Sequence, residues 1–160
     1  MSGTSQKKQA QPAPVWRRLA AMIYDSFLVL AIMFLVGFIN LGIQMKVYGA
    51  EELKAMTENG QSIGGPFFYA ALFLSIFSFF AFFWTRRGQT LGMQAWNIQI
   101  VDREGGYISI GQCLIRTLTA IPALLLCGLG VFWCLWDREH LSWQDRLSRS
   151  RTLYIPKQKS

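Results

Sequence analysis

Two oppositely charged residues near the N-terminus are the first candidates for a functional site in this sequence. Arg18 opens a long apolar stretch, and Asp25 lies inside that stretch. A charged side chain at the centre of a membrane-spanning helix costs about 2.5–3.5 kcal/mol on insertion scales, so an aspartate there indicates a functional site. A carboxylate in this position can bind a cation or a proton. Our first hypothesis is therefore ion- or proton-linked transport of a small solute, with Asp25 as the binding group.

The spacing of Arg18 and Asp25 argues against a direct ion pair between them. Seven residues place the two side chains within about 20° of each other around a helix, but about 10 Å apart along its axis. Each group therefore needs a partner from elsewhere. In the transport hypothesis, the alternate partner of the carboxylate is one of three arginines: Arg18, Arg116 or Arg146.

Two apolar stretches are long enough to cross a bilayer. A transmembrane helix needs about 20 predominantly apolar residues, and residues 19–39 and 66–84 meet this requirement. A third apolar stretch, residues 117–136, is interrupted by a proline and two glycines. We therefore expect an all-α membrane protein with two transmembrane helices and a third segment that is either a broken, re-entrant or interfacial hairpin or a full span.

Composition and charge narrow the class of protein. The chain is 52% hydrophobic and 16% charged, and its apolar residues are concentrated in three long blocks. A soluble core would instead spread them at the period of a helix or a strand. The net charge is +7, but Lys and Arg flank the apolar blocks, which indicates anionic lipid headgroups rather than nucleic acid as the partner.

The sequence lacks the residue patterns typical of an enzyme or a metal site. His140 is the single histidine, so one chain cannot build a histidine-based triad or metal cluster. The three cysteines, Cys113, Cys127 and Cys134, do not have the spacing of a metal or redox motif. We therefore expect no enzymatic activity, no cofactor and no bound metal.

The distribution of basic residues predicts how the chain is oriented in a bacterial inner membrane. Four Lys and Arg precede the first span, two lie between the spans, four lie in residues 86–116 and six follow Trp136. The positive-inside rule places the N-terminus and residues 86–116 in the cytoplasm. A simple third crossing would export the most basic segment, so we favour a turn near residues 127–130 that keeps the C-terminus cytoplasmic.

The chain divides into one membrane domain with a tail at each end. Residues 1–15 are polar and contain two lysines and two prolines, a composition typical of a disordered cytoplasmic tail. Residues 16–154 form the predicted membrane domain, and residues 155–160 form a second tail.

Three local patterns predict structure outside the spans. Residues 50–59 are acidic early and end at an Asn-Gly pair, which favours a short amphipathic surface helix. Residues 97–101 have a strand-like pattern, followed by turn residues, so a return strand at residues 107–108 predicts a small cytoplasmic β-hairpin. Ser109 with Gln112 three residues later is a capping-box pattern that opens a helix.

Four segments, taken in order, resemble the RDD family of small bacterial membrane proteins, named for one arginine and two aspartates. They are RRLAAMIYD (residues 17–25), TLGMQAWNIQIVDREGG (90–106), ISIGQCLIRTL (108–118) and LSWQDRLS (141–148). Together they cover nearly the whole chain from Trp16 to Tyr154. The resemblance implies two membrane-spanning regions, in agreement with the count of apolar stretches.

The resemblance also implies which charged residues matter. The family's arginine matches Arg18, and its first aspartate matches Asp25. Asp145 fits best as the second aspartate, with Asp102 as the competing match. Gln144 stands where the family usually has histidine, which weakens a proton relay at that position. The family's role is largely undefined; transport of unknown ligands has been suggested for it, and ion–proton exchange for some members.

Two functional hypotheses remain open at this point. Two or three short spans from one chain cannot enclose a pathway, so transport requires a homo-oligomer or another membrane subunit. The alternative is a membrane-bound interaction or assembly protein. In that case Asp25 is structural and pairs with an arginine, because charged groups inside membranes usually pair.

Overall fold

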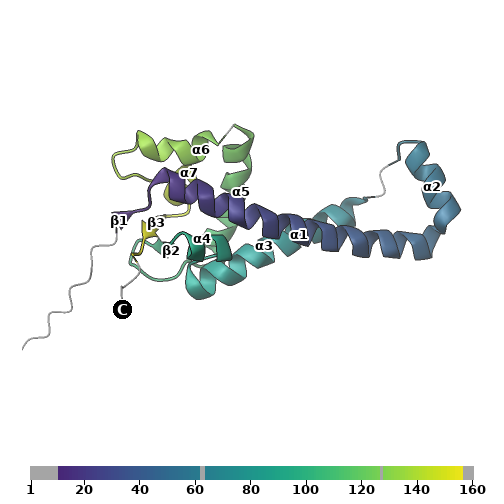
Figure 1. The fold of residues 1–160 in the computed structure, drawn as a ribbon, viewed down its shortest axis with the longest axis horizontal. Helices are drawn as coiled ribbons and strands as arrows, with labels where there is room; N and C mark the ends of the chain where they lie inside the picture. The colour runs from purple at the N-terminus through teal and green to yellow at the C-terminus, as the bar shows by residue number, and fades with distance from the viewer. Residues whose placement is uncertain (1–10, 62–63, 127, 157–160) are drawn as a thin grey trace, which may run out of the picture. The chain divides into compact units, whose positions relative to one another are not determined.

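The computed structural model describes residues 11–61, 64–126 and 128–156. This part of the chain is mostly helical and carries a small antiparallel sheet (Figure 1). The chain divides into two compact units, Met1–Asp25 with Phe80–Ser160, and Ser26–Phe79. We call the first the terminal unit and the second the helical unit.

Two of the described helices are long and apolar enough to cross a membrane: α1 (Val15–Tyr48) and α3 (Pro66–Arg87). They contain the two spans expected from the sequence. α1 is longer than expected, because its 34 residues correspond to about 51 Å, whereas the hydrocarbon core of a bilayer is about 30 Å thick. Residues 15–25 of α1 belong to the terminal unit.

The helix predicted at residues 50–59 is present as α2 (Ala50–Glu58). Glu51 and Glu52 lie in its first turn and Leu53 is its buried residue, so it is amphipathic as expected. The chain leaves the helix through Gly60, whose φ is 69°. Glycine adopts this left-handed conformation readily, which explains the stop.

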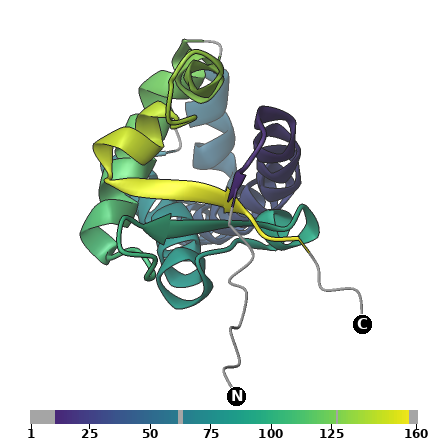
Figure 2. The same cartoon turned by 90° about the vertical axis from the view of Figure 1, so that its left-hand side faces the viewer.

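The sheet joins three segments that are distant in the sequence. Its strands are β1 (Gln11–Pro12), β2 (Ile98–Asp102) and β3 (Ser150–Tyr154). The order is β1-β3-β2, and both pairings are antiparallel (Figure 2). Tyr154 lies opposite Gln11 on one side and Ile98 on the other. The central strand therefore comes from the C-terminal tail.

This pairing corrects the predicted hairpin. β2 forms as expected, but residues 107–108 are not a strand. The carboxylate of Asp102 accepts hydrogen bonds from the backbone N–H groups of Glu104 and Gly106, which closes the turn on the end of β2. The chain then leaves the sheet with Ile108 buried. The C-terminal strand takes the place that the return strand was expected to fill.

The sheet also corrects the length of the N-terminal tail. Residues 11–12 form β1, and α1 begins at Val15, so residues 11–15 are not disordered as expected. The Ala13 N–H extends the pairing by donating to the carbonyl of Thr152 at 3.0 Å. The remainder of the expected tail, residues 1–10, lies outside the described residues.

The third apolar stretch is broken into short helices. They are α5 (Ile110–Leu125), α6 (Leu129–Phe132) and the 3₁₀ turn η1 (Trp133–Leu135). α5 is opened by the predicted Ser109–Gln112 capping box. Gly128, with φ of 81°, precedes α6 and is the residue at which the chain changes direction. The described residues contain no third helix of spanning length, and the break lies where the sequence predicted it.

Two five-residue helices complete the terminal unit. α4 (Leu91–Ala95) is capped by Thr90, and α7 (Trp143–Leu147) is capped by Ser142. The largest fully buried apolar side chains of the terminal unit are Ile98, Ile100, Ile108 and Cys113. These residues come from β2 and from the start of α5, so the core of the terminal unit lies beside the sheet.

Candidate functional site

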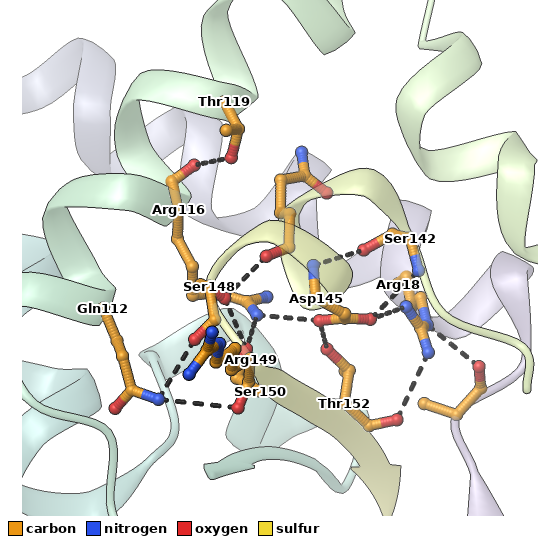
Figure 3. A network of polar contacts seen from close by, with 12 residues as sticks. Arg18, Gln112, Arg116, Thr119, Ser142, Asp145, Ser148, Arg149, Ser150 and Thr152 are labelled. Carbon is orange, nitrogen blue, oxygen red and sulfur yellow. Dashed lines mark hydrogen bonds and ion pairs between the residues drawn. The ribbon is translucent and has the colours of Figure 1, made fainter. Parts of the chain in front are cut away.

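Asp145 is the centre of a buried polar network in the terminal unit (Figure 3). Its Oδ2 accepts a hydrogen bond from Arg18 Nη1 at 2.6 Å, and its Oδ1 accepts one from Arg116 Nη1 at 2.7 Å. Thr152 Oγ1 donates to Oδ1 at 2.8 Å, and the Ser142 N–H donates to Oδ2 at 3.3 Å. Each carboxylate oxygen therefore accepts one hydrogen bond from an arginine and one from a neutral donor.

The start of α7 positions this carboxylate. Ser142 Oγ accepts a hydrogen bond from the Asp145 N–H at 3.3 Å, and the Asp145 side chain accepts one in return from the Ser142 N–H. This is a capping box with aspartate in the third helical position. Two donors that the helix itself leaves unpaired are thereby satisfied, and the aspartate side chain is held in one orientation.

Arg18 reaches the network from the first turn of α1. Its Nε donates to the carbonyl of Ala13 at 3.0 Å, and its Nη2 donates to the carbonyls of His140 at 3.2 Å and Thr152 at 3.3 Å. With the bond to Asp145, all three of its guanidinium nitrogens have partners. Arg18 thus joins the start of the chain to α7 and to β3.

Arg116 reaches the same carboxylate from the middle of α5. Its Nη1 also donates to Ser150 Oγ, which lies 2.7 Å from Ser148 Oγ. The guanidinium carbon lies 5.5 Å from the centre of the Trp84 ring, within the range of a cation–π contact. Arg116 Nε and Trp84 Nε1 are both buried and have no hydrogen-bond partner among the described residues.

The two arginines determine the protonation state of Asp145. Burial alone would raise the pKa of this carboxyl group. The Arg116 and Arg18 guanidinium groups outweigh that effect and, with the hydrogen bonds from Arg116 and Thr152, hold the pKa at about 2. Asp145 is therefore an anion throughout the physiological pH range.

Asp25 has a different set of partners. Its Oδ1 accepts a hydrogen bond from the Gly92 N–H at 2.9 Å, and its Oδ2 accepts one from Thr90 Oγ1. Thr90 Oγ1 in turn accepts from the Met93 N–H at 3.2 Å, as the N-cap of α4. Asp25 is 4% exposed. It therefore connects the last part of α1 within the terminal unit to the beginning of α4.

Gly92 makes this contact possible. A Cβ atom at this position would meet the carbonyl oxygen of Ala21 and would lie 2.9 Å from the carboxylate of Asp25. Real Cβ atoms do not approach other atoms so closely, so only glycine fits here without displacing α1 or α4. The Thr-x-Gly sequence at residues 90–92 thus supplies a hydroxyl donor, a backbone donor and the space for both.

The structure separates Arg18 from Asp25, as their spacing predicted. Arg18 pairs with Asp145, whereas Asp25 binds two neutral donors. The hypothesis that Asp25 pairs with an arginine is therefore wrong within the described residues. The physical reason is that Arg18 and Arg116 both point to the carboxylate of Asp145, which leaves neither available to Asp25.

The two remaining candidates lie outside the network. Arg146 Nη2 contacts Asp137 Oδ1 at 3.2 Å, and the arginine side chain is 57% exposed whereas that of Asp137 is 8% exposed, so Arg146 lies at the surface. Asp102 accepts two backbone hydrogen bonds within the turn after β2. The structure thus brings together Arg18, Arg116 and Asp145 and places the other three candidates elsewhere.

Sequence reasoning missed several residues that surround the two buried aspartates. They are Thr90 and Gly92 beside Asp25, and Ser142, Ser148, Ser150 and Thr152 beside Asp145. Two signals in the sequence indicate some of them. Ser142 and Asp145 have capping-box spacing, and Ser150 and Thr152 alternate with exposed residues as one face of a strand does.

Comparisons with known proteins identify the family of this chain. The family model described as RDD family matches residues 12–149, which is well over half of the sequence. No curated protein and no solved structure matches the chain. The chain therefore belongs to the RDD family, and this membership together with its two long apolar helices indicates a membrane protein.

Proposed function

We propose that this chain is a membrane-bound interaction or assembly protein of the bacterial inner membrane, and that its arginine–aspartate network is structural. One observation carries the proposal. Arg18, Asp25 and Asp145 are each at most 6% exposed, and each is engaged by partners within the terminal unit. A transport site would have to exchange its partners for a mobile ion, whereas these contacts hold segments of the chain together.

The network stabilises the fold because it joins segments that are far apart in the sequence. Arg18 comes from α1, Arg116 from α5 and Asp145 from α7, and Thr152 adds β3. Removing one member of a buried ion pair costs about 3–5 kcal/mol, because the other charge is left uncompensated. The terminal unit therefore depends on this carboxylate.

The strand pairing in the sheet supports placing both ends of the chain on the same side of the membrane. β1 precedes the first apolar helix, β2 follows the second, and β3 lies near the C-terminus. Strands that pair with one another must lie on one side of the bilayer. We propose two crossings, with both termini in the cytoplasm because basic residues dominate these segments.

We also propose that the first crossing begins after Asp25. Residues 26–48 of α1 lie in the helical unit and supply about 34 Å of helix, which is enough to cross the hydrocarbon core. Asp25 would then lie at the membrane boundary, rather than at the depth that the apolar stretch of residues 19–39 suggested.

The two long helices are the candidate surface for assembly. The most apolar part of α1 contains no buried residue, and that of α3 contains few. We propose that a homo-oligomer or another membrane subunit covers part of these helices, with lipid covering the remainder. The proposed role involves neither catalysis nor nucleic acid.

Ion- or proton-linked transport through an oligomer is the second candidate. The observation in its favour is that Asp25 accepts hydrogen bonds only from neutral groups among the contacts described. A buried carboxylate without a cationic partner is a suitable site for a proton or a metal cation. Such a pathway would need a second chain, because two helices cannot enclose one.

Proteoliposomes that contain wild type, Asp25→Asn or Asp102→Asn separate the two candidates. Proton flux is measured with sodium, potassium and lithium in turn, and the melting temperature is measured on the same preparations. We expect no cation-dependent flux in wild type and a lower melting temperature for Asp25→Asn alone. Asp102→Asn is the matched control, because Asp102 serves a surface turn. Wild-type flux that Asp25→Asn abolishes without a change in melting temperature would overturn the assembly proposal.

A further inference from the structure

One face of α5 is apolar and exposed along its whole length. Its residues recur at intervals of three or four and are between 40% and 78% exposed: Ile110, Leu114, Leu118, Ile121 and Leu125. The opposite face carries Cys113, Arg116 and Ala123, which are all buried. α5 packs against α7 and contributes to the charge network through that face. The exposed stripe therefore has no partner within the described part of the terminal unit.

The exposed apolar surface continues beyond α5. Large apolar side chains that are at least 42% exposed follow in and around α6 and η1: Leu126, Leu129, Trp133, Leu135 and Trp136. The sequence has no charged residue between Arg116 and Asp137. Large apolar side chains exposed in this number are rare on soluble proteins and indicate a site of protein or membrane contact.

Two features of α5 favour a helix that lies along a membrane over one that crosses it. Within the terminal unit, α5 runs crosswise to the first turns of α1 (Figures 1 and 2). The 16 residues of α5 are also too short to span, at about 24 Å.

Charged residues that follow this apolar stretch in the sequence indicate the partner. Exposed arginines follow the apolar stretch at Arg138, Arg149 and Arg151, and Arg146 is more than half exposed. Trp133 and Trp136 lie between the apolar stripe and these arginines in the sequence. Tryptophan favours the level of the lipid headgroups, and arginine is attracted to anionic headgroups. A second copy of the chain would present arginines of the same charge.

We propose that α5, α6 and η1 form an in-plane element that inserts its exposed apolar face into the cytoplasmic leaflet of an anionic bilayer. The buried face of α5 stays on the charge network, and the arginines after η1 contact the headgroups. The proposal rests on the membrane location in the proposed function.

Spin-label depth measurements test this placement on the full chain in anionic nanodiscs. The three cysteines are first changed to alanine, and single cysteines are then introduced as Leu114→Cys, Leu118→Cys, Ile121→Cys and Leu125→Cys. Collision rates with oxygen and with a water-soluble nickel chelate give the depth of each label. We expect all four labels in lipid, at depths within about 5 Å of one another, because in-plane helices sink about 5–10 Å into the headgroup boundary.

A crossing or re-entrant helix gives a different profile. Depth would then change by about 1.5 Å per residue, or by about 16 Å from position 114 to position 125. That gradient would overturn the proposal, as would four labels accessible to the nickel chelate. Labels shielded from both reagents would also overturn it, because they would indicate a protein partner.

Two further labels distinguish a failure of the in-plane element from a failure of the proposed membrane location. Phe34→Cys lies in the apolar part of α1, and Tyr107→Cys lies in the terminal unit, before the start of α5. Lipid at position 34 and water at position 107, together with water at the four α5 positions, would overturn only the in-plane element. Water at position 34 would overturn the membrane location and the in-plane element together.

The headgroup contact has its own test. Arg138→Gln with Arg151→Gln should move a label at position 118 toward water in anionic nanodiscs and leave it unchanged in zwitterionic ones. The matched control is Arg103→Gln with Lys54→Gln, which removes two exposed positive charges from segments outside the in-plane element. An unchanged depth, or an equal change in both lipids, would overturn the contact with anionic headgroups.

Discussion

Asp145 and Asp25 are both buried in the terminal unit, but they are held in different ways. Asp145 is neutralised by Arg18 and Arg116, and its two oxygens accept four hydrogen bonds. Asp25 accepts hydrogen bonds from one hydroxyl and one backbone N–H. The first aspartate is required as a charge, because two buried arginines depend on it. The second is required mainly as an acceptor of the right shape.

The largest effect should come from removing the charge of Asp145. Asp145→Asn leaves Arg18 and Arg116 buried without an anion, which should destabilise the protein by about 3–5 kcal/mol. Thermal unfolding in detergent, followed by tryptophan fluorescence, measures this loss. Asp102→Asn is the control and should stay near wild type. A small loss of stability for Asp145→Asn would show that other groups compensate the charges of the two arginines.

Gly92→Ala should give the next largest effect. The new methyl group would meet the backbone carbonyl of Ala21 as well as the Asp25 side chain. Because a backbone atom cannot rotate away, we expect a loss of about 3 kcal/mol, at the upper end of the range for overpacking. Gly111→Ala, whose Cβ would meet only Ser109 Oγ at an ordinary contact distance of 3.9 Å, should cost nothing. Equal melting temperatures for the two variants would contradict the close contact of α1 with α4.

Acid should weaken the Asp145 network in a defined pH range. The folded pKa of this group, about 2, lies below its ordinary value of 3.8, so the unfolded chain binds the proton more readily. The stabilisation is complete above about pH 4 and decreases as the pH falls toward 2. The loss is about 2 kcal/mol. Wild type should show this decrease relative to Asp145→Asn, in unfolding midpoints measured from pH 5 to pH 2.

Asp25→Asn should have the smallest effect of the four. An asparagine keeps one acceptor oxygen for Gly92 or Thr90 and leaves no cation unpaired. We expect a loss of about 1 kcal/mol, which is typical of one hydrogen bond. Thr90→Val removes the matching donor and the cap of α4, so it should cost at least as much. A loss for Asp25→Asn as large as that for Asp145→Asn would remove the distinction between the two aspartates.

Patterns within a short stretch of sequence predicted local structure well. The capping box at Ser109 and Gln112, the amphipathic α2 and the break before Gly128 all depend on neighbouring residues. The two long apolar helices were also predictable, because length and composition decide whether a helix can cross a bilayer. Such features require no knowledge of distant contacts.

Features that depend on distant contacts were not predictable in this way. β2 was expected to pair with the next few residues, but its partner β3 lies about 50 residues later. The partners of Asp25 could not be predicted from the apolar stretch around it, because they are Thr90 and Gly92. Similarly, the charges of Arg18, Arg116 and Asp145 could be named as candidates, but their convergence is a property of the folded terminal unit.

A double-mutant cycle between Arg18 and Asp145 tests most directly whether this network stabilises the fold. The free energy of unfolding is measured for wild type, Arg18→Gln, Asp145→Asn and the double variant. Direct contact at 2.6 Å predicts that the double variant loses less than the sum of the two single losses, by about 1–3 kcal/mol. Losses that simply add would contradict the pairing of these two residues and the structural role proposed for the network.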